Sequence, residues 1–304
     1  MTADESAPPP INAVPLRHPW RWVAALVIIA LVTLFLWGAA TNPDYHWSAY
    51  RQYVFDKTVI TAALRTLELT VYSMVLAVLL GVTLAVMRLS PNSVLKSVAW
   101  VYIWIFRGTP VYVQLVFWGL FPVLYSHIQL GIPWGPTFFE LDLTNFSFYF
   151  LMAVIGLGLN EAAYMAEIIR AGITSVPEGQ TEASTALGMS WWMTMRRTIL
   201  PQAMRVIIPP TGNEVISMLK TTSLVTAVPY SLELYGRAHD IGIELFQPIP
   251  LLLVASTWYL AITSVLMVGQ YYLERYFSRG ASRKLTTKQL EALAQAQRGA
   301  EEHL

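Results

Sequence analysis

Charged side chains interrupt long apolar runs of this sequence, where their burial is costly. They are Arg65, Arg107, Lys220, Glu68, Glu161, Glu214 and Glu167. Each would cost at least about 2.5 kcal/mol if it faced lipid at mid-depth. We therefore expect them to face the interior of a helix bundle, a water-filled cavity or one another. A set with both signs of charge suits a solute that itself carries both signs, because opposite charges form the strong hydrogen bonds.

Structural pairing explains part of this set without any solute. Arg65 and Glu68 lie three residues apart, so they can pair on one helix. Arg107 comes shortly before Pro110 and can satisfy carbonyl groups that a broken helix leaves free. Both explanations therefore remain open for these residues.

A second polar group falls on two predicted helices. Asn160, Glu161 and Tyr164 share one helical face, and Asn213 and Glu214 belong to another apolar run. Counting about 1.5 Å per residue from the ends of the run places Glu161 near mid-depth. Such residues either line a polar path or hydrogen-bond neighbouring helices to each other. We predict a path, with Glu161 as the first contact for a cationic group.

Other kinds of site have little support in the sequence. There is no cysteine, and the five histidines lack the spacing of metal ligands. No Gly-Lys pair occurs, so the chain lacks the phosphate-binding loop that ends in Gly-Lys-Ser/Thr. With 13% charged residues and a net charge of +1, nucleic acid is not an expected partner. We expect no metal or cofactor in this chain, and no nucleophile and base converge to favour a membrane enzyme.

The elements that must position the polar residues are long apolar helices. Hydrophobic residues make up 55% of the chain and the mean hydropathy is +0.47, so we predict an all-α membrane protein. Six apolar runs are long enough to cross a hydrocarbon core of about 30 Å. They span residues 22–39, 58–87, 97–124, 148–171, 204–228 and 249–276. The first could instead belong to a signal peptide, but its length and the lack of a small-residue cleavage site favour a span.

Lysine and arginine indicate which side faces the cytoplasm. The loops on one side carry fourteen of them, whereas those on the other carry only Arg51, Lys57 and Arg237. Cytoplasmic loops are enriched in these residues, so the first side is predicted to be cytoplasmic. Six spans return the chain to the side on which it began, which predicts that both termini are cytoplasmic.

The longest inner loop reads as two short helices. Ser175 and Glu178 have the spacing of a capping box at the start of the first helix. Gly188 is placed to end that helix, Ser190 to cap the second and Pro201 to stop it. The second helix is rich in Trp and Met, so it either inserts into a groove on another protein or lies on the membrane surface.

This loop resembles the EAA loop of permeases in binding-protein-dependent ABC importers. The residues that carry the resemblance are Glu182, Ala183, Ser184, Gly188, Leu200 and Pro201. Two positions depart from the family pattern, since Ser184 replaces a second alanine and Thr198 stands where isoleucine is usual. Further motifs are similar to the polar amino acid branch, namely Arg107–Pro110, Ala163–Arg170, Leu200–Ala203 and Asn213–Leu224. The resemblance covers roughly residues 58–276.

The resemblance implies a type I ABC importer permease, with a five-helix core and one added N-terminal helix. Its expected partners are two copies of an ATP-binding-cassette ATPase that holds ATP and Mg, an extracytoplasmic amino acid binding protein, and a second permease chain, identical or sister. The setting is the bacterial cytoplasmic membrane. The residues expected to dock on the ATPase are Glu182, Ala183, Ser184, Gly188, Trp191, Leu200 and Pro201. Those expected along the substrate path are Glu161, Asn160, Tyr164, Asn213, Glu214, Glu68, Arg107 and Lys220.

One alternative function is a stand-alone secondary amino acid transporter that uses Glu68 and Glu161 to couple to an ion gradient. The apolar inner loop disfavours it, because a solitary transporter needs no docking surface.

The predicted division of the chain is a disordered cytoplasmic leader, an extra helix with its outer loop, a permease core that includes a coupling loop at 175–201, and a cytoplasmic tail. These parts span residues 1–19, 20–57, 58–276 and 277–304.

Overall fold

The computed structural model describes residues 19–132, 135–143 and 146–277. The predicted leader, apart from Pro19, and the predicted tail, apart from Phe277, lie outside the described residues. The chain divides into two compact units, Met1–Trp47 and Ser48–Leu304, each of which is described by itself.

The first unit contains one long helix, α1 (Pro19–Thr41). It is long and apolar enough to cross a membrane, and its most apolar stretch is exposed all round. A helix that is apolar on every side is stable in lipid rather than in water. Its end is held locally, because Trp47 Nε1 donates to the Ala39 carbonyl at 3.0 Å and the Trp47 ring stacks on Tyr45.

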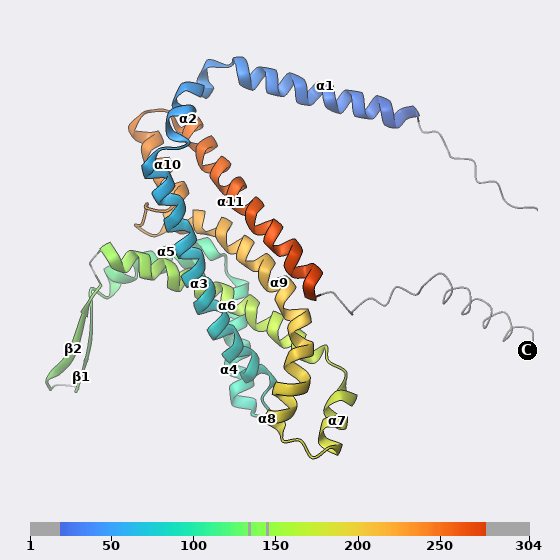
Figure 1. The fold of residues 1–304 in the computed structure, drawn as a ribbon. Coiled ribbons are helices and arrows are strands. Elements are labelled where there is room, and N and C mark those ends of the chain that lie inside the picture. Colours follow the sequence, from blue (N-terminus) through green and yellow to red (C-terminus); the bar gives the residue numbers. More distant parts are fainter. Residues whose placement is uncertain (1–18, 133–134, 144–145, 278–304) are drawn as a thin grey trace, which may run out of the picture. The chain divides into compact units, whose positions relative to one another are not determined.

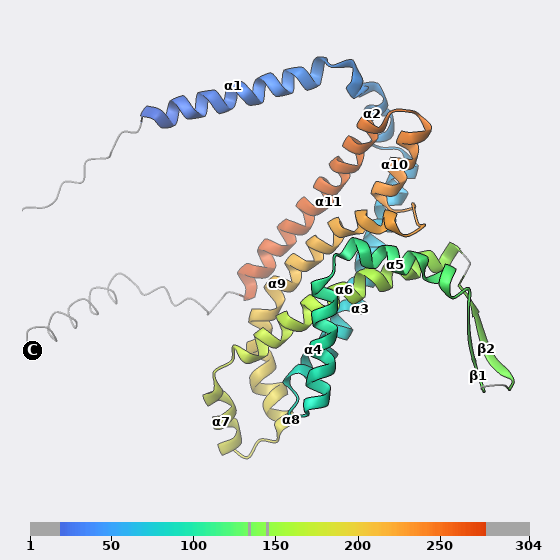
Figure 2. The same ribbon diagram turned by 180° about the vertical axis from the view of Figure 1, so that it is seen from behind.

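The second unit is a bundle of helices with one small hairpin (Figures 1 and 2). In chain order, its helices are α2 (Trp47–Tyr53, which straddles the unit boundary), α3 (Lys57–Leu89), α4 (Ser93–Gly108), α5 (Val111–Leu124), α6 (Phe146–Thr174), α7 (Glu178–Ala186), α8 (Trp191–Thr194), α9 (Leu200–Thr221), α10 (Leu234–Glu244) and α11 (Pro248–Phe277). The hairpin pairs β1 (His127–Gly131) with β2 (Thr137–Asp142) in antiparallel register. The sequence analysis did not predict it.

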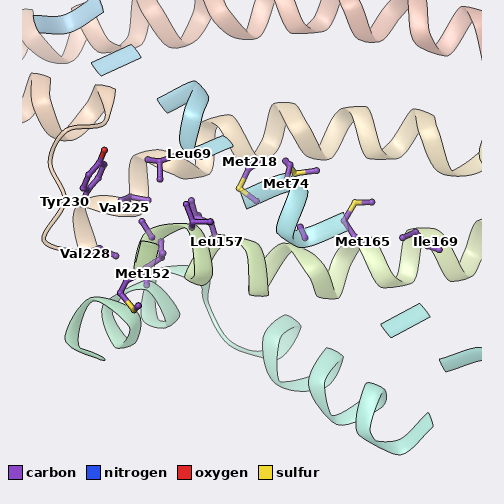
Figure 3. Packing of buried hydrophobic residues seen from close by; sticks show 14 of the residues in the cluster. Leu69, Met74, Met152, Leu157, Met165, Ile169, Met218, Val225, Val228 and Tyr230 are labelled. Atoms are coloured by element: carbon purple, nitrogen blue, oxygen red, sulfur yellow. The ribbon is translucent and has the colours of Figure 1, made fainter. Parts of the chain in front are cut away.

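The centre of the second unit is the packing of α3 against α6, with α9 beside them. Small residues let the backbones approach, and a Cβ built on Gly81 would lie 2.6 Å from the Met165 Cβ. Larger side chains fill the space between the helices, with Met74 from α3, Leu157 from α6 and Met218 from α9 in one buried cluster (Figure 3). This packing fixes the faces of α6 and α9 relative to each other.

The predicted run 97–124 is not a single helix. It divides at Thr109 and Pro110 into α4 and α5, because Pro110 has no N–H to donate and disfavours helical backbone before it. The run 204–228 also differs, since α9 ends at Thr221 and a 3₁₀ turn, Thr222–Ala227, follows. Among the described residues, four helices are long and apolar enough to span a membrane, namely α1, α3, α6 and α11. The count of six spans stays a prediction.

Buried polar contacts hold one end of the second unit together. Glu233 caps α10 by accepting from the backbone N–H groups of Tyr235, at 2.8 Å, and of Gly236. The N–H of Leu234 donates to Thr66 Oγ1 of α3 at 2.9 Å. These bonds attach α10 to α3.

The short segment before α3 packs on the same end. Trp258 Nε1 of α11 donates to the Val54 carbonyl at 2.7 Å, and the hydroxyls of Tyr50 and Thr257 lie 3.0 Å apart. The second unit begins at Ser48, and the division of the chain at residues 57 and 58 stays a prediction.

Candidate functional site

A cavity of about 300 Å³ opens between α6, α9 and the start of α5. It is lined by Val111, Leu157, Asn160, Glu161, Tyr164, Glu214, Ser217, Met218 and Thr221. Its volume lies at the lower end of the range of small-molecule sites, about 300–1,000 Å³. Among the described residues, the lining includes two carboxylates and no Lys, Arg or His. We call this cavity the acidic pocket.

Glu161 and Glu214 are the charged groups of the acidic pocket. Glu161 is only 8% exposed, and its Oε1 is buried without a hydrogen-bond partner. Glu214 lies close enough to interact with it electrostatically. Within the described part of the chain, neither carboxylate forms a salt bridge. Two neighbouring carboxylates without a cation can hold a positively charged group between them, because its charge would offset their repulsion.

Helical periodicity explains why these residues meet. Glu161 and Tyr164 lie three residues apart on α6, and Glu214, Ser217 and Thr221 follow one another along a single face of α9. The packing of α6 on α9 turns the two faces toward each other. The pocket therefore depends on the contact between helices that are far apart in sequence.

Asn160 also lines the acidic pocket, but its amide group stabilises the break between α4 and α5. Its Nδ2 donates to the Phe106 carbonyl at 2.9 Å and to Gln114 Oε1 at 3.1 Å. Gln114 Nε2 donates in turn to the Phe106 carbonyl at 3.0 Å and to Thr109 Oγ1 at 2.7 Å. The two amides thus satisfy groups that the interrupted helix leaves free.

The other predicted path residues lie outside the acidic pocket. Glu68 pairs with Arg65 at 2.6 Å, as the structural explanation anticipated. Arg107 places its guanidinium 5.2 Å from the centre of the Tyr164 ring, a cation–π contact. Asn213 is exposed, and Lys220 lines a separate cavity.

Sequence reasoning left three polar residues of this region out of the site. Ser217 and Thr221 follow Glu214 by three and seven residues, so helical spacing alone was a sufficient signal for them. Gln114 is the only side-chain amide in the apolar helix α5, and a lone polar residue in an apolar helix could have drawn attention to it. Among the described residues, no group of three or more His, Cys, Asp or Glu side chains is arranged to hold a metal ion.

The inner loop, residues 175–201, folds into α7, α8 and a π-helical turn, Met195–Ile199. Gly188 ends the first segment with φ +71°, and the N–H of Met189 donates to the Ser184 carbonyl at 3.1 Å. This backbone conformation favours glycine, as the sequence predicted. Ser190 caps α8 by accepting from the N–H of Met193.

Two details of that loop differ from the prediction. The hydroxyl of Ser175 donates to the Gly172 carbonyl and forms no capping box, since α7 begins after Pro177. Pro201 does not stop a helix but occupies the first turn of α9, where its missing N–H costs nothing.

The same loop exposes a group of large apolar side chains. Leu187 is 81% exposed, Trp191 70% and Trp192 64%. Exposed apolar groups of this kind are typical of surfaces that contact another protein or a membrane.

Residues 77–279 match the family of binding-protein-dependent transport system inner membrane components. This chain belongs to that family of permeases. It is 64% identical to the arginine transport system permease protein ArgU of Corynebacterium glutamicum, over 97% of this chain and 92% of that protein. It is 38% identical to the histidine/lysine/arginine/ornithine transport system permease protein HisM of Salmonella typhimurium, over 66% of this chain and 82% of that protein.

The permease also resembles a solved structure. It superposes on the crystal structure of an amino acid ABC transporter with histidines, with a TM-score of 0.60 and 33% identity, over 72% of this chain and 94% of that chain. The fold is therefore that of a type I ABC importer permease, as the inner loop predicted. The alternative of a secondary transporter is wrong, because this family works with a binding protein and a separate ATPase. The permease is a multi-pass protein of the inner membrane.

Proposed function

We propose that this permease forms the translocation path for a cationic amino acid, with arginine as the first candidate, delivered by an extracytoplasmic binding protein. The observation that carries this proposal is the pair of carboxylates in the acidic pocket, Glu161 and Glu214, with no cation in its lining. A guanidinium or ammonium group offers the charge that these buried groups lack.

The relatives support a cationic substrate. The two permeases quoted above serve systems for arginine and for histidine, lysine, arginine and ornithine. Arginine, lysine and ornithine carry cationic side chains at pH 7, and histidine can gain a positive charge near that pH, which agrees with an acidic rather than a basic pocket.

The roles proposed for the path residues follow from their surroundings. Glu161 and Glu214 bind the cationic group, Tyr164 borders it, and Asn160 holds the wall of the pocket in place. Asn213, Glu68, Arg107 and Lys220 stay predicted contacts elsewhere along the path.

The assembly we propose has two ATPase subunits, which hold ATP and Mg, and a second permease chain, identical or sister. Both termini face the cytoplasm. The docking residues toward the ATPase are Glu182, Ala183, Ser184, Gly188, Trp191, Leu200 and Pro201. The exposed cluster at Leu187, Trp191 and Trp192 supports this docking, because such a surface is unfavourable in water.

The test of the substrate is uptake of radiolabelled arginine by the reconstituted complex. Glu161→Gln and Glu214→Gln keep the shape of the pocket and remove one charge each. The affinity for arginine should fall about tenfold to a hundredfold, which corresponds to a loss of roughly 1.5–3 kcal/mol. Assembly with the ATPase and the resting ATPase rate should persist.

Glu274→Gln is the matched control, since Glu274 lies exposed near the end of α11 and away from the acidic pocket. It should leave uptake unchanged. Normal arginine uptake by both pocket variants would show that the two carboxylates are structural.

A further inference from the structure

A second charged cavity, of about 420 Å³, lies between the first turns of α3 and the segment around α10. Three cations line it, Lys57 and Arg65 from α3 and Arg237 from α10. Lys57 and Arg65 are eight residues apart on a helix, so they share a face. No carboxylate lines the cavity in the part of the chain that the structure describes. We call this cavity the basic pocket.

The carboxylates that the structure describes near the basic pocket offset its positive charge only in part. Arg65 is paired with Glu68, but within the described residues no salt bridge involves Lys57 or Arg237. Asp56 adjoins Lys57 and interacts with it electrostatically, and its carboxylate also accepts from the N–H of Thr58 at 2.7 Å as the cap of α3. The pocket therefore keeps an excess of positive charge that an anionic group can balance.

Buried hydrogen bonds hold in place the two helices that form the basic pocket, α3 and α10. α10, which supplies Arg237, is attached to α3 through the bond from the Leu234 N–H to Thr66. The fully buried Glu233 caps α10 and accepts from the hydroxyl of Tyr259 on α11 at 3.1 Å. A group bound between α3 and α10 would thus contact two elements that are held in a fixed relation.

The sign of the charge selects the occupant. By the proposed orientation, the outer loops carry only Arg51, Lys57 and Arg237 as cations, and two of these three line this pocket. A cationic substrate would be repelled there. Transport in this family depends on a binding protein, which by the proposed orientation meets the permease on the outer side. We propose that the basic pocket receives a carboxylate side chain, Asp or Glu, of the docking binding protein. The inference rests on the proposed orientation of the chain.

The experiment measures ATPase activity of the reconstituted permease–ATPase complex against the concentration of an arginine-loaded binding protein that stimulates the wild type. Lys57→Glu and Arg237→Glu should raise the concentration for half-maximal stimulation at least about tenfold, because like charges then meet in the interface. The basal and maximal rates should not change. Added salt should weaken docking of the wild type and have little effect on the variants.

Arg51→Glu is the matched control, since Arg51 is an exposed outer cation that does not line the pocket. It should leave the half-maximal concentration unchanged. If a Glu variant does not assemble, Lys57→Gln and Arg237→Gln replace it and should show a smaller increase.

Three results would overturn the proposal. One is an unchanged half-maximal concentration in the pocket variants. Another is an altered requirement for anionic lipid, seen by comparing phosphatidylglycerol-containing with neutral vesicles, because the pocket would then hold a lipid phosphate. The third is a change in amino acid selectivity alone, which would make the pocket part of the substrate path. A reversed orientation would instead appear in the cysteine labelling described below.

Discussion

The hydroxyls of Ser184 and Thr198 lie 3.1 Å apart and share a hydrogen bond that joins α7 to the π-helical turn before α9. Ser184 is buried and also donates to the Gln180 carbonyl at 2.8 Å. These are the two residues that depart from the alanine and isoleucine usual in the EAA loop. The departures therefore occur as a pair, and each supplies a polar partner for the other.

A double-mutant cycle tests this relationship. Ser184→Ala and Thr198→Ile should each lower the stability of the permease–ATPase complex by about 0.5–1.5 kcal/mol, because each removes the shared hydrogen bond. The double variant should cost clearly less than the sum of the two, since it leaves no unpaired hydroxyl. Thermal unfolding of the purified complex measures all three. Strictly additive effects would show that the two hydroxyls act independently.

Gly188 should be needed for transmission between the ATPase and the pore. A side chain there has open space but would hold a left-handed backbone, which costs about 1–2 kcal/mol and more for a β-branched residue. Gly188→Val should reduce arginine uptake and its link to ATP hydrolysis while the protein stays in the membrane. Gly179→Val is the control, because Gly179 also has open space but no positive φ. Equal effects of the two substitutions would contradict this role.

Asn160 and Glu161 are neighbours with different proposed roles, so substitutions at the two positions should affect different properties. One should lower stability and the other the affinity for arginine. Asn160→Leu removes donors to Phe106 and Gln114, so it should lower the free energy of unfolding by about 1–3 kcal/mol. Glu161→Gln should leave stability nearly unchanged and reduce the affinity for arginine. Thermal unfolding and uptake, measured on the same preparations, distinguish the two. A stable Asn160→Leu protein would mean that Gln114 holds the helix break alone.

The close approach of α3 and α6 should not tolerate even one added methyl group. Gly81→Ala would place a Cβ 2.6 Å from the Met165 Cβ and 3.2 Å from the Ala166 nitrogen. The resulting shift should cost about 1–3 kcal/mol of stability. Gly269→Ala on α11 meets nothing within 4 Å and should be neutral or stabilising by up to about 1 kcal/mol. Unfolding of detergent-solubilised protein compares them, and a Gly81→Ala protein as stable as the wild type would disprove this packing.

Single cysteines test the orientation, because the chain has none of its own. Ser126→Cys, in the exposed segment before β1, should react with an impermeant thiol reagent in intact cells. Ser93→Cys, exposed at the start of α4, should react only after the cells are opened. The opposite pattern would reverse the proposed topology and remove the basis for placing the basic pocket outside.

Much of the inner loop could be predicted from local sequence alone. Gly188 ends a helix because few other residues tolerate its backbone conformation, and Ser190 caps the next because its side chain reaches a nearby N–H. Both effects act within a few residues. The predicted capping box at Ser175 was wrong, because the Ser175 hydroxyl donates to the Gly172 carbonyl instead.

The acidic pocket could be predicted only in part. Helical spacing placed Asn160, Glu161 and Tyr164 on one face, but spacing cannot say what lies opposite that face. The structure shows Asn160 bound to the break between α4 and α5, and it brings Glu214 rather than Arg107 into the pocket with Glu161. Those outcomes depend on contacts between residues more than 40 positions apart.

Local patterns determined most of the apolar helices, the two short helices of the inner loop and the family, because hydrophobicity, capping and short motifs depend on neighbouring residues. Tertiary packing alone decided which charges meet. Arg65 could pair within its own helix and did so, whereas Glu161 forms no salt bridge among the described residues and lies buried near Glu214 of α9. The packing of α10 on α3 likewise brought Lys57 and Arg237 into one cavity, although they are far apart in sequence. Buried charges and charged pockets arise where helices touch, and the approach of two helices depends on side chains distant in sequence.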